Sequence, residues 1–104
     1  MPVPVAATGY GSRLTVDLGA LIRNWQALDK VSDGALTGAV VKGDAYGTGI
    51  DAASRAFYFA GARFFFVATP DEALAVRAAL PDAFIFVLDG LFPGAAPLYV
   101  GERL

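Results

Sequence analysis

The sequence of 104 residues contains no cysteine and no histidine. The missing cysteines exclude disulfides, thiolate metal sites and cysteine nucleophiles, and the missing histidines remove the commonest general base and metal ligand. Charge is also scarce: 17% of residues are charged, the net charge is −2, and the basic residues are too scattered for a nucleic-acid-binding stripe. Catalysis in this chain would therefore have to use lysine, tyrosine, carboxylates, hydroxyls or the backbone.

Long apolar runs are missing as well. None approaches the ~18 residues that span a bilayer, and residues 1–5 (MPVPV) have no basic region ahead of an apolar core, which a signal peptide would have. We therefore expect a cytoplasmic protein with no membrane partner and no nucleic-acid partner. Apolar residues nevertheless make up 56% of the chain, which is enough to bury the core of one small domain.

The periodicity of the apolar residues predicts alternating helices and strands. Residues 1–12 are expected to form an irregular arm, residues 12–17 a short extended segment, and Asp17 the N-cap of a helix with an apolar stripe from Leu18 to Leu28. Further on, strands are expected at 36–41, 64–68 and 83–88, a helix at 51–61 with Asp51 as its N-cap, and a helix at 69–80. This order is typical of parallel α/β structure.

Two of these elements carry specific signals. Thr69-Pro70-Asp71-Glu72 predicts a helix start, with Thr69 as N-cap, Pro70 at the first helical position and Glu72 completing a capping box. The strand at 64–68 is apolar on both faces, which predicts cover on both sides of the sheet.

The segment from Val40 to Gly49, VVKGDAYGTG, carries the chemistry. An apolar strand leads directly to Lys42, and a glycine-rich turn with Tyr46 follows. A lysine at this place either reaches solvent with its amine or uses the amine in a reaction. An amine partly removed from water loses proton affinity and becomes a nucleophile toward a carbonyl carbon, as needed to hold an aldehyde cofactor.

Two parallel architectures compete for this pattern. The loop after Lys42 lacks the G-x-G-x-x-G spacing of a doubly wound dinucleotide-binding sheet, and it has no lysine after its glycines as a P-loop has. In a (β/α)8 barrel, chemistry is carried at the carboxyl ends of the strands, which is where Lys42 and Leu88-Asp89 fall. The barrel is the better fit.

With these motifs in place, the chain resembles the N-terminal part of the alanine racemases, which are pyridoxal-phosphate (PLP) enzymes built from a barrel and a C-terminal β domain. The resemblance runs from about residue 13 to about residue 99. The residues that carry it are Leu14-Thr15-Val16-Asp17 with Asn24, Ala39 to Gly49, Phe65 to Ala68, Asp71-Glu72-Ala73 with Arg77, and Val87 to Gly90. It implies that residues 13–104 form about the first three strand–helix units of a (β/α)8 TIM barrel.

The resemblance also implies roles for particular residues. Lys42 would be the Schiff-base lysine and one of two acid/base groups, Tyr46 would reach the cofactor phosphate, and Val40 and Leu88 would line the cofactor pocket. The substrate would be alanine, interconverted between its L and D forms to supply D-alanine for peptidoglycan, and no metal is implied. The second base would be a tyrosine from the C-terminal domain of the partner subunit in a homodimer.

Some features depart from the family pattern. Gly43 stands where the family usually has alanine, and Phe57-Tyr58-Phe59 is bulkier than expected. A complete barrel takes ~250 residues, so the chain is expected to be an N-terminal fragment that is inactive alone. Another PLP barrel protein, such as a decarboxylase or a PLP carrier, and a non-catalytic fragment remain as alternatives.

Two charged residues have simpler interpretations. Asp44 is expected to be a turn or capping carboxylate rather than a catalytic acid. Arg77 is expected to pair with Asp71, with Glu72 or with a partner strand.

Overall fold

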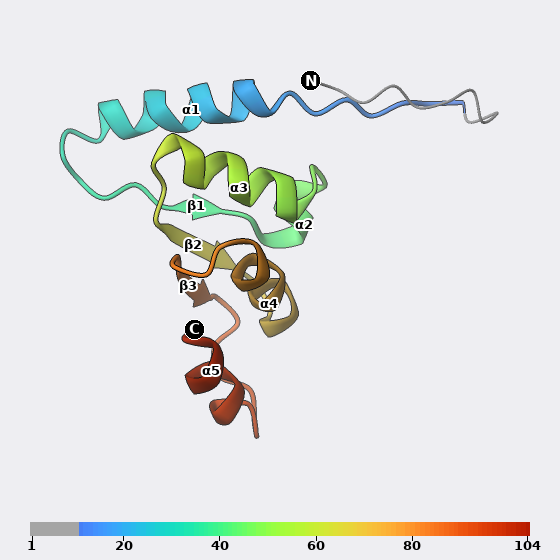
Figure 1. Ribbon diagram of the computed structural model, residues 1–104, viewed down its shortest axis with the longest axis vertical. Coiled ribbons are helices and arrows are strands. Elements are labelled where there is room, and N and C mark those ends of the chain that lie inside the picture. The colour runs from blue at the N-terminus through green and yellow to red at the C-terminus, as the bar shows by residue number, and fades with distance from the viewer. Residues whose placement is uncertain (1–10) are drawn as a thin grey trace.

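A computed structural model describes residues 11–104, so the arm predicted for residues 1–12 lies almost wholly outside the described residues. Helices and strands alternate along the described chain (Figure 1). No helix in this range is long and apolar enough to cross a membrane. The elements are α1 (Leu18–Val31), β1 (Ala39–Val40), α2 (Lys42–Tyr46), α3 (Ile50–Ala60), β2 (Phe64–Val67), α4 (Pro70–Ala79), β3 (Phe84–Val87) and α5 (Ala96–Glu102).

The three strands form one parallel sheet in the order β1-β2-β3. Val40 is paired with Phe66, which is paired with Phe86. In a barrel wall, each strand lies next to the strand that precedes it in the chain, as here. In a doubly wound sheet, the strand order reverses partway through the sheet. The prediction of parallel α/β structure is confirmed.

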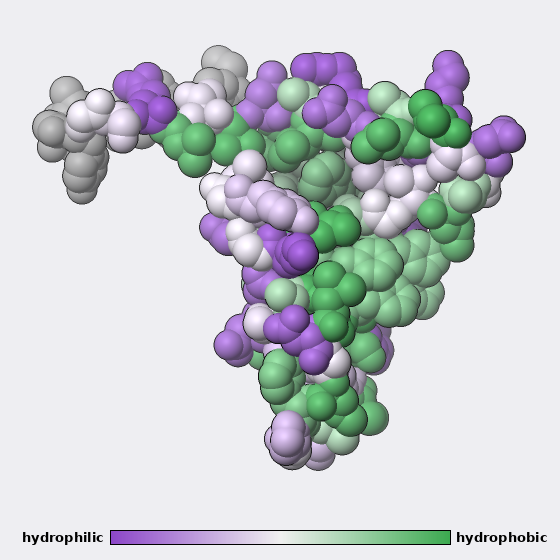
Figure 2. Space-filling view, turned by 180° about the vertical axis from the view of Figure 1, so that it is seen from behind, coloured by the Kyte–Doolittle hydropathy of each residue, from purple (hydrophilic) through white to green (hydrophobic). Residues whose placement is uncertain are grey.

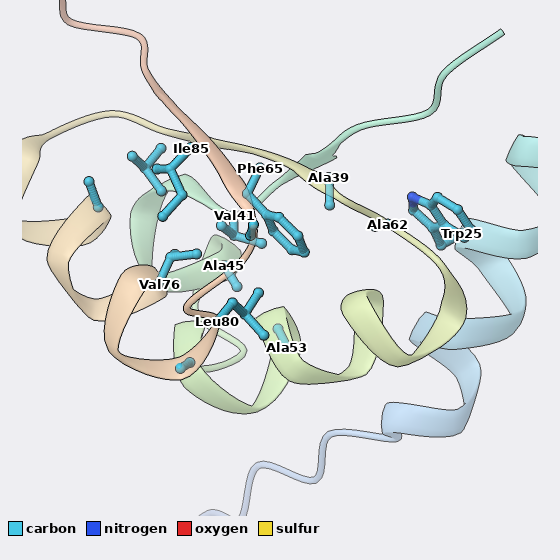
Figure 3. Packing of buried hydrophobic residues seen from close by; sticks show 14 residues of the cluster. Trp25, Ala39, Val41, Ala45, Ala53, Ala62, Phe65, Val76, Leu80 and Ile85 are labelled. Atoms are coloured by element: carbon cyan, nitrogen blue, oxygen red, sulfur yellow. The ribbon is translucent and has the colours of Figure 1, made fainter. Parts of the chain in front are cut away.

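One face of the sheet is buried under α3 and α4. Phe65 and Val67 on β2 and Val76 on α4 have no exposed surface, and Ile85 on β3 is 3% exposed. Figure 3 shows these strands and helices contributing side chains to a single cluster, with Trp25 of α1 at its margin. Full burial of a side chain such as Phe65 contributes about 1.5–3 kcal/mol, so this cluster is the main source of stability.

The opposite face of the sheet is open among residues 11–104. Phe64 stacks on Phe84 with ring centroids 5.1 Å apart, and Phe66 stacks on Phe86 at 5.0 Å. Figure 2 shows apolar surface spread over this side of the molecule. The prediction that both faces would be covered is therefore wrong for the described chain, because α3 and α4 lie on one side and α1 packs on α3 instead of the sheet.

The N-terminal region departs from expectation in two details. Residues 12–17 pair with no strand of the described sheet, although Asp17 caps α1 as predicted, its Oδ1 accepting a hydrogen bond from Ala20 N at 3.0 Å. Leu28 is 66% exposed, because the apolar stripe of α1 is wider than the surface that α3 covers. Trp25, which belongs to the apolar stripe predicted from Leu18 to Leu28, is buried, and its Nε1 donates to Gly38 O at 3.3 Å.

Strand β1 is shorter than predicted. It comprises two residues instead of the six expected at 36–41, and Leu36 is 80% exposed. β1 lies at the margin of the sheet and pairs with β2 alone. The preceding residues have no second strand to hold them in an extended ladder.

The buried guanidinium of Arg77 binds the C-terminal segment to the rest of the fold through hydrogen bonds. Arg77 pairs with neither Asp71 nor Glu72, which corrects two of the three expected partners; the third, a strand, is met in part through Ala83 O, directly before β3. It donates to backbone carbonyl oxygens at distances of 2.7–3.2 Å. These acceptors belong to the end of α4, the start of β3 and the end of α5: Leu80, Pro81, Ala83, Glu102 and Arg103. Burial and the nearby charge of Arg103 lower the pKa of Arg77, but a guanidinium stays protonated in proteins.

Replacing Arg77 with alanine is expected to destabilise the fold by about 3 kcal/mol, because buried carbonyl oxygens would lose their donors. Denaturant unfolding followed by circular dichroism measures this. Arg55→Ala is the control, since its pair with Asp51 is exposed and is worth roughly 0.5 kcal/mol or less. Equal stability losses in the two variants would contradict the anchoring role of Arg77.

Candidate functional site

The carboxyl ends of the parallel strands lie at one edge of the sheet. Strand alignment continues past the strand ends, where Leu88 N donates to Val67 O at 2.7 Å and Asp89 N to Ala68 O at 3.1 Å. Lys42 stands two residues beyond Val40, and Leu88 stands two residues beyond Phe86, so both lie at the same level of this edge. The sequence placed them there correctly.

The four candidate residues all present surface to solvent. Tyr46 is 68% exposed, Leu88 53% and Val40 45%, and Lys42 is exposed as well. Within residues 11–104, neither the Lys42 amine nor the Tyr46 hydroxyl has a hydrogen-bond or ion-pair partner. The partial burial expected for Lys42 is not found in the described chain, because nothing covers the open face of the sheet beside it.

Lys42 opens a turn with an uncommon backbone. In α2, the residues after Lys42 have positive φ angles: 62° at Gly43, 54° at Asp44, 55° at Ala45 and 56° at Tyr46. The turn is therefore left-handed, at a cost of roughly 1–2 kcal/mol for each non-glycine residue. Gly43 adopts this conformation without that penalty.

Hydrogen bonds within the segment close the turn. Ala45 N donates to Val41 O at 2.9 Å, and Gly47 N donates to Gly43 O at 2.9 Å. Ala45 itself is 6% exposed and belongs to the core cluster. The strained backbone is thus stabilised by hydrogen bonds to its own carbonyl oxygens and by burial of the Ala45 methyl group.

Asp44 joins this turn to the next helix. Its Oδ1 accepts a hydrogen bond from Ile50 N, the first residue of α3, at 2.8 Å. The expectation that Asp44 is a turn or capping carboxylate is confirmed. The prediction that Asp51 is the N-cap is wrong: Gly49 is the N-cap, and Asp51 lies in the first turn of α3, where it pairs with Arg55 at 3.2 Å.

Glu72 links the turn to the neighbouring strand. Its Oε1 accepts from Ala68 N at 2.9 Å, and its Oε2 accepts from Asp44 N at 3.2 Å. Burial raises the pKa of Glu72, but these backbone hydrogen bonds, with smaller contributions from Gly43 and Thr69, outweigh it and hold the pKa below its usual value. The group is therefore a carboxylate at neutral pH.

Sequence reasoning recognised Glu72 only as a helix-capping residue. The Thr69 half of the capping box is confirmed, since Thr69 Oγ1 accepts from Glu72 N at 3.3 Å. The link to Asp44 was missed, because it joins residues 28 positions apart. One signal in the sequence could have indicated this link. Glu72 lies in the first turn of the capped helix that follows β2, and β2 and the strand before Lys42 are neighbouring parallel strands that end at the same edge.

The residues at this edge suit an aldehyde cofactor with a phosphate group. An unpaired primary amine can add to a carbonyl carbon, and a free phenol hydroxyl can donate to a phosphate oxygen. Val40 and Leu88 add apolar surface at the same level of the sheet. The donor set is compatible with the cofactor that the sequence suggested.

Comparison with known proteins agrees with this geometry. The family model "Alanine racemase, N-terminal domain" matches residues 16–104. An alanine racemase from Methylobacterium sp. (strain 4-46) is 54% identical over 99 residues, which cover 95% of this chain. The chain spans 27% of the length of that relative.

Solved structures show the same relationship. Alanine racemase from Bartonella henselae, described with covalently bound pyridoxal phosphate, superposes with a TM-score of 0.82 at 34% identity, covering 86% of this chain and 26% of that one. Alanine racemase from Streptomyces coelicolor A3(2) gives 0.75 at 43% identity, covering 86% and 24%. The sheet and its helices thus match the N-terminal part of a racemase barrel, and the chain belongs to the alanine racemase N-terminal domain family.

Proposed function

We propose that the protein carrying this chain is a PLP-dependent alanine racemase in which Lys42 holds the cofactor covalently. The observation that carries the proposal is the Lys42 amine, which has no partner among residues 11–104 and lies at the carboxyl end of β1, at the start of the left-handed turn. The Bartonella relative, described with covalently bound pyridoxal phosphate, supports the choice of cofactor.

Each candidate residue receives a role under this proposal. Lys42 supplies the amine, Tyr46 donates its hydroxyl proton to the phosphate, and Val40 and Leu88 form apolar walls at the sheet edge. PLP, when bound, supplies an electron sink that accepts the electrons left when a proton leaves the substrate Cα. The left-handed turn after Lys42 sets the path of the chain between its amine and the phenol of Tyr46.

Racemisation requires proton transfer on both faces of the substrate carbon. The Lys42 amine would serve one face, taking up or returning the Cα proton. The chain spans 27% of its Methylobacterium relative, and we propose that the opposing base lies outside it. A tyrosine from the C-terminal domain of a partner subunit would fill this role, which makes the active protein a homodimer. We propose the cytoplasm as its compartment.

Treatment with PLP followed by borohydride reduction is expected to leave a stable adduct on Lys42, identified by peptide mass spectrometry. Lys30 is the other lysine of the chain and lies in α1, away from the sheet edge. Lys42→Arg should abolish the adduct, and Lys30→Arg should leave it unchanged. An adduct on Lys30 with Lys42 unmodified would refute the assignment.

In deuterium oxide, the full-length protein is expected to convert L-alanine into D-alanine that carries deuterium at Cα, because the transferred proton exchanges with solvent. Chiral chromatography separates D-alanine from L-alanine, and mass detection measures the deuterium in each. Lys42→Arg should lower the rate by a factor of about 10³, since it removes one acid/base group and the cofactor link.

The purified 104-residue chain should give no turnover in the same assay, because it lacks the opposing base. Turnover by this chain alone would overturn the two-base proposal. Loss of the carboxyl group in place of inversion would identify a decarboxylase.

A further inference from the structure

From the contacts of its carboxylate, we infer that Glu72 is a positioning residue for Lys42, holding the backbone beyond the lysine against the end of β2. This inference rests on the proposed role of Lys42. Glu72 does not approach the reacting atoms itself. It acts through the turn that follows the lysine.

The bridge spans two neighbouring strand ends. Oε1 accepts from Ala68 N, directly after β2, and Oε2 accepts from Asp44 N, two residues after Lys42. Apart from contacts with Glu72, the hydrogen bonds of residues 42–49 in the described structure have their partners within residues 41–53. Glu72 is therefore the hydrogen-bonding group that ties this turn to a different part of the sheet.

The turn needs such an external tie because of Gly43. Gly43 lies between Lys42 and Asp44 and has the widest backbone freedom of any residue type. A Cβ added there would meet nothing within 4 Å, so no packing restrains this position. Residues held in sparsely populated backbone conformations persist only where the surroundings fix them. Fixing Asp44 N limits the motion of the peptide groups on either side of Gly43.

The chemistry of the bridge requires a carboxylate. The backbone N–H groups of Ala68 and Asp44 donate to different oxygens of Glu72, and an ionised carboxylate offers an acceptor oxygen to each. A glutamine of the same shape offers one oxygen and one NH2, so one N–H would meet another donor. Aspartate keeps the charge but is one methylene shorter, and it cannot span both N–H groups from the same place on α4.

The test measures PLP adduct formation on the full-length apoprotein under conditions in which each variant is folded. The rate at Lys42 is divided by the rate at Lys30, which serves as an internal reference in the same molecule. We expect Glu72→Gln to lower this ratio by about tenfold, as is typical when a reacting group is displaced by a fraction of an ångström to an ångström. Hydrogen exchange at the Asp44 amide should become faster in the same variant, with or without PLP.

Two matched variants separate positioning from stability and charge. Asp71→Asn removes an exposed charge from the same turn of α4 and should change the ratio by less than about twofold. Thr69→Ala removes the N-cap side chain of α4, whose Oγ1 accepts from Glu72 N, and so destabilises the start of the helix. It removes no contact of Asp44, so the ratio should again be retained. Should Glu72→Gln fail to fold, Glu72→Asp is expected to give a smaller but measurable loss.

A normal ratio in folded Glu72→Gln or Glu72→Asp would overturn the inference while leaving the role of Lys42 intact. An equal loss in Thr69→Ala would also overturn it, because helix stability alone would then explain the effect. Absence of an adduct at Lys42 in the unsubstituted protein would instead refute the proposed function.

Discussion

The arrangement of this chain depends on burial of the inner face of β2. Phe65 and Val67 have no exposed surface, and the helices before and after β2 both pack on that side. Because each connection returns over the same face, the strands run parallel and their carboxyl ends reach one edge. Lys42, Glu72 and Leu88 are distant in sequence, and they come to this edge because apolar side chains elsewhere are buried.

Local strain is concentrated beside Lys42. The left-handed turn after Lys42 includes Asp44, Ala45 and Tyr46, none of which favours positive φ. The burial of Ala45, the contact of Asp44 with α3 and the contact from Glu72 together offset that strain. Such strain is common where side chains must be held in fixed relative positions. In this protein it sets the path of the chain between the amine and the phenol.

Predictions based on local chemistry succeeded, and predictions that depended on distant partners failed. The Thr69 cap and the strand leading to Lys42 follow from residues adjacent in sequence. The start of α3 was misplaced because Asp44, six residues upstream, supplies the cap that Asp51 was expected to provide. Arg77 was expected to pair with Asp71, with Glu72 or with a strand, whereas folding brings backbone carbonyl oxygens from three segments around it. These partners cannot be identified from periodicity.

By itself, the sequence determined the parallel α/β class, the position of Lys42 at a strand end and the family relationship, because these depend on local pattern and on a specific motif. The tertiary structure decided that one sheet face is buried and the other open among residues 11–104, and that Lys42 is exposed. It also decided that Glu72 bridges two strand ends. The physical reason is that burial and long-range hydrogen bonds depend on which surfaces meet in space, and this is fixed only when the helices pack on the sheet.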